Sequence, residues 1–391
     1  MALQPAAGAR DLNPREVERQ RRLCERLAEV YRHWGYQEVA PPSIERIDTL
    51  EAGGAIAGRE VVRLVADAPL GLRPELTASI ARAASTRMAH RPRPLRLWAS
   101  GTTFRAFLGD GGDWRISENL QSGVELLGER SDAADMELMH LLLTAVSKLG
   151  LEPSHHPTLL VGHHALLGAL LEVVPEPHRH LARERITAFD ALGLDALPIP
   201  EPSLGRLRAL LRLRGEPAMV LYQLEQWLGR LPLLNRLESL LKSVEPLASK
   251  GGVRLQLDPT FQPHFDLYDG LVFKLVCQGR DAPVAIASGG RYDRLMGRFC
   301  DDPSLAAGTG FGFSIAALQE LLAPESAPGS EAGPWLVAAA EHTLLPAALA
   351  RMAALHAQGQ AAELCGRACP SQEDAQRWAE ERGCRGAIWL G

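Results

Sequence analysis

Apolar and polar residues recur along this chain with two different periods, which predict where helices and strands form. Val17, Cys24 and Leu27 fall on one face at helical spacing, so we predict a helix that begins at Asn13 and ends at Gly35. Apolar runs bounded by Gly, Pro or Asp predict strands. These strands cover residues 36–42, 94–105, 119–128, 253–258, 269–279 and 282–290, and a hairpin joins 61–67 to 70–75.

Helical patterns account for most of the remaining sequence before residue 250. Helices are predicted at 77–88 and at 131–150, where Ser131 is placed to cap the first turn. From about residue 160 to 250 the pattern is almost wholly helical, with one break at 195–203. We therefore predict an α+β fold, in which helices flank an antiparallel sheet and a helical insertion occupies about 180–250.

The last part of the chain has a different organisation. Residues 323–334 are rich in Pro, Gly, Ala and Ser, a composition typical of a linker. Beyond them, strand and helix patterns alternate over 335–391, which predicts a small α/β unit with a parallel sheet. The predicted organisation is a main domain at 1–322, the linker, and this C-terminal unit.

Composition narrows the classes of function. The 391 residues carry a formal net charge of −5, and no basic stripe predicts binding to tRNA or another nucleic acid. No apolar run reaches the roughly 18 residues of a membrane span, so no membrane partner is expected. The six cysteines complete no metal-ligand set and are expected to be reduced thiols of a cytoplasmic protein. We predict neither a metal nor a cofactor.

An uncharged glycine-rich stretch, GTGFGFSIAAL at 308–318, leads from a strand into a helix. Its glycine spacing is not that of a dinucleotide-binding loop, and the chain has no Gly-Lys-Ser/Thr phosphate loop. A strand of this kind usually presents a group to a ligand, yet this one offers no charge. The role of this stretch must therefore depend on the residues that lie around it.

A set of polar residues marks one face of the predicted sheet. Gln121, Gly123 and Glu125 share a face because side chains alternate along a strand, and Arg105 belongs to a neighbouring strand. If this face is enclosed, it forms a polar pocket suited to a small zwitterion with a basic side chain. If it is open to water, these are ordinary surface residues. Further candidates for the pocket are Glu75, Thr77, Tyr268, Arg291 and Tyr292.

The order of several motifs resembles that of histidyl-tRNA synthetases over residues 8–322. The motifs are LRPELTAS, TTFR, LQSGVELLG, ASGGRYDRL and GTGFGFSIAAL, and GYQEVAPPSIE resembles the first class II motif, which implies a dimer interface. The resemblance implies a class II synthetase-like fold with a histidine pocket. In that pocket Glu75, Thr77 and Gln121 would hold the α-amino group, and Glu125 and Tyr268 the imidazole. Tyr292 would form a wall, and Arg105 matches the second-motif arginine.

Two departures from the synthetase pattern change the expected function. Ala317 stands where the third motif has its ATP-binding arginine, and Pro263 stands where the RGLDYYTG signature has its catalytic arginine. Losing one preorganised donor commonly reduces a rate 10²–10³-fold, so we expect negligible adenylate formation. The loop at 106–114 also carries two acids where the synthetase loop is basic.

A retained amino-acid pocket without nucleotide chemistry is similar to one known family, the regulatory subunits of ATP phosphoribosyltransferase. This resemblance implies a non-catalytic chain that activates a short-form catalytic subunit. It also implies free histidine as a feedback effector. The alternatives are an active histidyl-tRNA synthetase and a stand-alone histidine-binding module.

Overall fold

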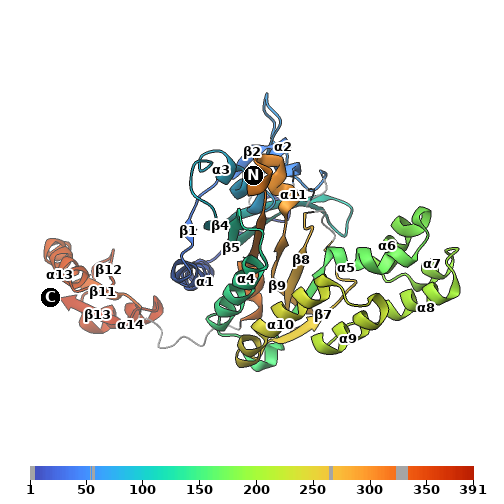
Figure 1. The fold of residues 1–391 in the computed structure, drawn as a ribbon. Coiled ribbons are helices and arrows are strands. Elements are labelled where there is room, and N and C mark those ends of the chain that lie inside the picture. Colours follow the sequence, from blue (N-terminus) through green and yellow to red (C-terminus); the bar gives the residue numbers. More distant parts are fainter. Residues whose placement is uncertain (1–4, 53, 55–57, 264–266, 323–332) are drawn as a thin grey trace. The chain divides into compact units, whose positions relative to one another are not determined.

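The computed structural model describes residues 5–52, 54, 58–263, 267–322 and 333–391 (Figure 1). The chain divides into two compact units, Met1–Leu322 and Ala323–Gly391. In the described ranges, no helix combines the length and apolar character needed to cross a membrane. The first ten residues of the predicted linker lie outside the described residues.

An eight-stranded sheet forms the centre of the larger unit. Its pairs are antiparallel except for two, β1 with β4 and β6 with β7. The predicted class, α+β with an antiparallel sheet flanked by helices, is confirmed. In spatial order the strands are β1 (Gln37–Glu38), β4 (Leu95–Leu108), β5 (Trp114–Leu127), β10 (Gly308–Ser314), β9 (Pro283–Arg291), β8 (Leu271–Gln278), β6 (Thr158–His163) and β7 (Arg254–Leu257).

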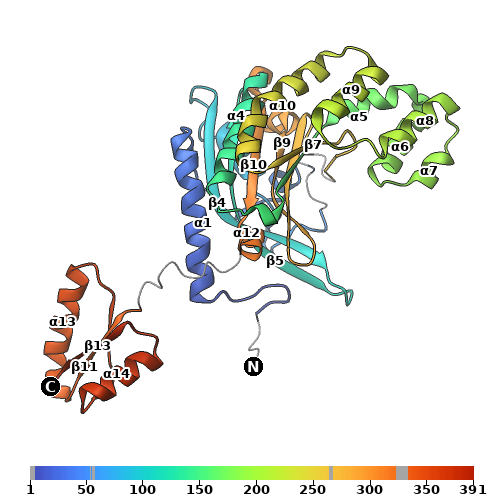
Figure 2. The same cartoon turned by 90° about the horizontal axis from the view of Figure 1, so that it is seen from below.

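The two faces of this sheet pack against different helices. One face, which includes Trp98, Val124 and Phe311, buries the largest apolar core. This core is completed by α1 (Pro14–His33), α4 (Asp132–Ser147), α10 (Pro232–Lys250) and α12 (Ile315–Leu321) (Figure 2). The other face meets a smaller core from α2 (Ile47–Glu51), α3 (Thr77–Ser85) and α11 (Asp293–Phe299). This second face is incompletely covered and leaves room for a cavity.

The first helix begins where the sequence predicts. The Asn13 side chain accepts the backbone N–H of Glu16 at 3.0 Å, and the Glu16 carboxylate accepts that of Asn13 at 2.8 Å. Such a capping box satisfies two N–H groups that the helix itself cannot pair. The predicted cap at Ser131 is wrong in its mechanism, because Ser131 has the N-cap position but its side chain accepts no bond from α4.

A strand that the sequence pattern does not reveal lies just before the predicted helical insertion, at the start of the stretch with a helical pattern. β6 lies between β8 and β7 in the sheet, whereas this region was expected to be almost wholly helical. A short apolar run such as Thr158–His163 fits a buried strand or a helix equally well, and only its place in the sheet decides. The helices that follow are α5 (His164–Leu170), α6 (Arg179–Thr187), α7 (Ala191–Asp195), α8 (Glu201–Leu210) and α9 (Pro217–Leu228).

The predicted hairpin of 61–67 with 70–75 is only a minor contact. β3 (Leu70–Leu72) pairs chiefly with β2 (Ile44–Arg46), and a single bridge joins Arg63 to Gly71. A strand has two edges, and the sequence does not show which partner takes each. By contrast, the β4–β5 hairpin is longer than predicted and pairs continuously from Leu95 opposite Leu127 to Leu108 opposite Trp114.

The smaller unit has the predicted small α/β architecture. Its three-stranded sheet is parallel and runs in the order β12 (Ala362–Leu364), β11 (Trp335–Ala339), β13 (Gly386–Leu390). Apolar side chains pack on both of its faces, against α13 (Leu345–Ala357) and α14 (Gln372–Glu381). Buried parallel strands of this kind are typical of α/β units.

Candidate functional site

The glycines of β10 make room for side chains from other elements. A Cβ atom on Gly310 would lie 1.7 Å from Oε2 of Glu125, and one on Gly308 would lie 2.4 Å from the ring of Tyr292. On the neighbouring strand β9, a Cβ on Gly290 would lie 2.7 Å from the ring of Tyr268. The glycine-rich stretch therefore presents no group of its own. Its bare backbone, together with Gly290 of β9, is the floor on which an acid and two tyrosines lie.

A cavity of about 280 Å³ opens above this floor. It is lined by six of the seven residues that the resemblance places in the pocket, namely Glu75, Thr77, Arg105, Gln121, Glu125 and Tyr268. Tyr292 does not line the cavity but hydrogen-bonds to Glu125 behind it. Of the two interpretations of this polar face, the enclosed one is therefore correct. The cavity lies just below the 300–1,000 Å³ typical of drug-sized ligands, so it suits a small molecule.

Glu125 is the most unusual group in the cavity. The hydroxyl of Thr77 donates to its Oε1 at 2.6 Å, and the hydroxyl of Tyr292 donates to its Oε2. Only 4% of the residue is exposed. Burial raises the pKa of this carboxyl to about 8, and the two hydrogen bonds offset only part of that effect. Near neutral pH the Glu125 carboxyl therefore holds a proton that a basic ligand can take.

Glu75 has a structural role as well as a place in the cavity. Its carboxylate accepts the backbone N–H groups of Thr77 and of Ala78, the latter at 2.9 Å, at the start of α3. Burial raises the pKa of Glu75, although those bonds and the charge of Arg105 act in the opposite direction. A carboxylate at a helix N-terminus is stabilised by the helix dipole. Glu75 thus fixes the loop that carries Thr77 toward Glu125.

The predicted second-motif arginine faces the same cavity. Arg105 lines it from β4, and its Nε donates to the carbonyl of Pro74 at 3.4 Å. Gln121 lines it from β5 and lies opposite Ser314 of β10. The strand alternation in the sequence therefore placed these side chains on the correct face.

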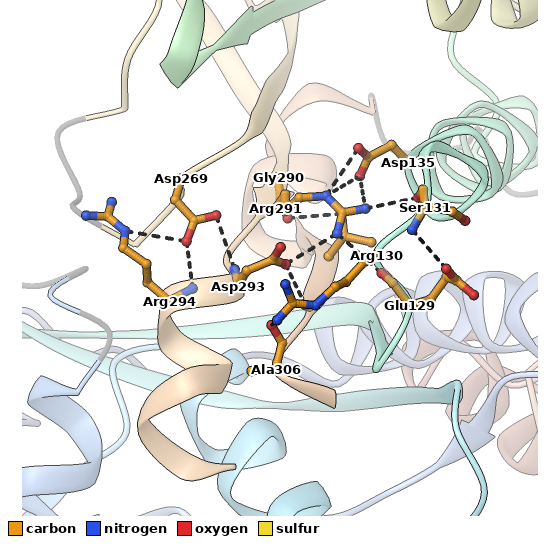
Figure 3. A network of polar contacts seen from close by, with 12 residues as sticks. Glu129, Arg130, Ser131, Asp135, Asp269, Gly290, Arg291, Asp293, Arg294 and Ala306 are labelled. Carbon is orange, nitrogen blue, oxygen red and sulfur yellow. Dashed lines mark hydrogen bonds and ion pairs between the residues drawn. The ribbon is translucent and has the colours of Figure 1, made fainter. Parts of the chain in front are cut away.

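Arg291, in contrast, is not part of the cavity. Its Nη2 donates to Asp135 at 3.0 Å and its Nη1 to Asp293 at 3.3 Å, while the carbonyls of Glu129 and Ser131 accept two more bonds (Figure 3). Arg291 follows Gly290, whose bare face lies against Tyr268, so the alternation of the strand turns the Arg291 side chain away from the cavity. The expectation that Arg291 helps to hold a ligand in the cavity is wrong.

Lys274 lines the cavity and was not anticipated. It is the one charged residue in the apolar strand LVFKLV, and it lies opposite Ser288, which also lines the cavity. A single charge inside an otherwise apolar strand was the available signal. The sequence could not show that Lys274 reaches the cavity, because its position depends on β8 lying beside β9.

The comparisons with known proteins first define the class. A family model described as histidyl-tRNA synthetase matches residues 8–318. The fold also matches the crystal structure of an ATP phosphoribosyltransferase regulatory subunit/histidyl-tRNA synthetase from Bacillus halodurans C. That match has a TM-score of 0.83 at 24% identity and covers 100% of this chain and 98% of the other. The larger unit is therefore a histidyl-tRNA synthetase-like class II fold, as the motifs indicated.

The curated relatives then define the family. ATP phosphoribosyltransferase regulatory subunits from Prochlorococcus marinus (strain MIT 9313) and Synechococcus sp. (strain RCC307) are 52% and 51% identical, over 100% of each chain. The chain belongs to the family of ATP phosphoribosyltransferase regulatory subunits. The predicted family is thereby confirmed.

Two glycines of β10 should respond differently to the same substitution. In Gly310→Ala the new methyl group would overlap the Glu125 carboxylate and approach the carbonyl of Val124 at 2.6 Å. We expect a loss of about 1–3 kcal/mol in the free energy of unfolding, measured by urea denaturation. Gly312→Ala is the matched control, because a Cβ there meets no atom within 4 Å. Equal stabilities of the two variants would contradict this account of the glycine floor.

Proposed function

We propose that this chain activates a short-form ATP phosphoribosyltransferase catalytic subunit and binds free histidine in the cavity as a feedback inhibitor. The partner carries out the phosphoribosyl transfer, and the chain itself is not an enzyme. We place both in the cytoplasm, with the chain also self-associating as a dimer through its first-motif region. It requires no metal or cofactor and binds no tRNA.

One observation carries this proposal, the buried carboxyl of Glu125. A buried acid without a counter-ion costs free energy, and a fold retains it when a ligand compensates. An imidazole can take the proton of Glu125 and form an ion pair with it, while the hydroxyls of Thr77 and Tyr292 hold the carboxylate in place. Free histidine also brings an ammonium group, for which Glu75 lines the same cavity.

The positions that would serve nucleotide chemistry support a role without catalysis. Ala317 lies in the first turn of α12, where its backbone N–H bonds to Ser314 and its side chain carries no charge. Pro263 lines the cavity but has no side-chain donor. The hairpin loop between β4 and β5 carries Asp110 and Asp113. Negative charge at a site for triphosphate would oppose binding.

Feedback then follows from a difference in affinity. Histidine can shift the assembly only if it binds one arrangement of the subunits more tightly than the other. Coupling free energies of this kind are typically 1–3 kcal/mol, which corresponds to a change of about 5–150-fold. The bound amino acid joins α3, β5 and the segment that carries Tyr268, so it can favour one relative position of these elements.

The decisive experiment measures phosphoribosyl transfer by the short catalytic subunit, with and without this chain, over a titration of histidine. We expect the chain to raise the rate and histidine to lower it. Histidine-dependent ATP–pyrophosphate exchange by the chain alone should be absent. Exchange at the rate of an active synthetase would instead support the synthetase alternative. Histidine binding without co-purification of the catalytic subunit would support a stand-alone binding module.

A further inference from the structure

The cavity contains a cation at the end away from Glu125. Lys274 projects from β8 onto the cavity face, and its Nζ lies 5.7 Å from the ring centroid of Phe261. Among the residues that the structure describes, no carboxylate lies within ion-pair distance of this ammonium group. The aromatic ring compensates for only part of its charge. Lys274 is half-buried, so water does not surround it fully.

The register of the sheet fixes where Lys274 lies relative to Glu125. Four residues form one row across the sheet, in the order Lys274 (β8), Ser288 (β9), Gly312 (β10) and Gly123 (β5). Glu125 is two residues further along β5, on the same face. The strands β5 and β8 are separated by three strand spacings, or about 14 Å. The acid and the ammonium therefore lie at opposite sides of one floor, with small residues between them.

The charged residues of the cavity differ in how far neighbouring groups compensate their charges. Burial raises the pKa of Glu75, and the charge of Arg105 acts in the opposite direction. Glu125 is largely protonated near neutral pH, because burial raises its pKa to about 8. Lys274 is the cation left with only an aromatic neighbour in the described part of the cavity. A ligand with a basic group near Glu125 should therefore carry an anionic group near Lys274.

We propose that Lys274 binds the carboxylate of the amino-acid effector and so selects a free amino acid over its decarboxylated or reduced analogues. Pro263 and Phe261 line the same cavity, and neither side chain can supply a positive charge there. The ammonium of Lys274 takes that role from another strand. This inference rests on the proposed function, because it assumes that histidine is the ligand.

The test is a calorimetric titration of the full chain with histidine and with histidinol, in which a hydroxymethyl group replaces the carboxylate. In Lys274→Met the affinity for histidine should fall about 10–100-fold, the usual effect of losing a charge-assisted hydrogen bond. The affinity for histidinol should stay within about twofold. Lys274→Arg should keep most of the histidine affinity, since it keeps the charge.

The controls separate the inference from the proposed function. Lys148→Met removes an exposed lysine at the end of α4 and should alter neither titration. If the unmodified chain and Lys274→Met bind histidine equally, Lys274 does not bind the carboxylate. The same conclusion holds if Lys274→Met weakens the binding of histidine and of histidinol to the same extent. If the unmodified chain takes up neither compound, both proposals are wrong. A fold defect in Lys274→Met would appear as a lowered melting temperature, and Lys274→Arg then decides the question.

Discussion

In the Glu125→Gln variant, we expect that histidine no longer inhibits the assembly, while activation of the catalytic subunit persists. The amide cannot give a proton to the imidazole or carry the negative charge of an ion pair. We expect the affinity for histidine to fall at least about 100-fold, because the ligand's imidazole is left buried without its partner. Calorimetry with histidine and the phosphoribosyl transfer assay measure the two effects separately. Inhibition at unchanged histidine concentrations would place the sensing site elsewhere.

The same variant should be more stable than the unmodified chain when no ligand is present. The pKa of Glu125 is about 8 in the fold, against the ordinary value of 4.5 for a glutamate side chain. Below the lower value the carboxyl is protonated in both states and contributes no difference. Between the two values only the unfolded state loses its proton, so stability falls as the pH rises.

The glutamine side chain of this variant does not titrate between these pH values. It can still hydrogen-bond to the hydroxyls of Thr77 and Tyr292. The advantage of Glu125→Gln should therefore grow from near zero at pH 4.5 to roughly 5 kcal/mol above pH 8. Urea unfolding at pH 5 and pH 8 measures this difference. Ser304→Ala in the exposed 3-10 helix Pro303–Leu305 is the control, because its partner Asp302 has a lowered pKa and stays ionised, so no such growth is expected between pH 5 and pH 8. A pH-independent difference between the Glu125 variant and the unmodified chain would refute the account of a buried, protonated acid.

Arg291→Met should be strongly destabilising, because the arginine is buried and ion-paired. The substitution leaves Asp135 and Asp293 without their shared cation, and it removes one hydrogen bond each from the carbonyls of Glu129 and Ser131. The side chain of Arg291 is only 10% exposed and that of Asp135 only 16%, so water does not replace the lost contacts. Breaking a buried ion pair from one side costs about 3–5 kcal/mol, which denaturant unfolding measures.

The neighbouring pair in the same network supplies the control. Arg294 contacts Asp269 at 3.4 Å, but its side chain is 66% exposed (Figure 3). Arg294→Met should cost less than about 1 kcal/mol. The double variant Arg291→Met with Asp135→Leu should recover part of the loss, because it removes the stranded carboxylate. Similar losses from Arg291→Met and Arg294→Met would show that burial does not distinguish these two pairs.

The candidate site was partly accessible from the sequence. Strand alternation placed Gln121 and Glu125 on one face, and the motifs identified Thr77 and Tyr268 as their neighbours. The structure brings these four side chains to a single cavity. Local rules sufficed here because each residue's direction is set by the strand or helix end that carries it.

Other parts of the site could be recognised only from the tertiary structure. Arg291 and Tyr292 are adjacent in one motif, yet one bonds to α4 and the other to Glu125. Lys274 was overlooked because β8 reaches the cavity only through β9 and β10, and that order is not local information. The role of Gly310 was likewise invisible, since the group that fills its space belongs to β5.

The sequence by itself determined the first helix, the main strands, the small α/β unit and the family of the chain. These features depend on periodicity, capping and short motifs, which act over a few residues. The tertiary structure decided which face of the sheet is enclosed, where β6 inserts, and which charged side chains meet. Those outcomes depend on the order and register of strands far apart in the chain, since contacts between strands are made by residues that no local pattern connects.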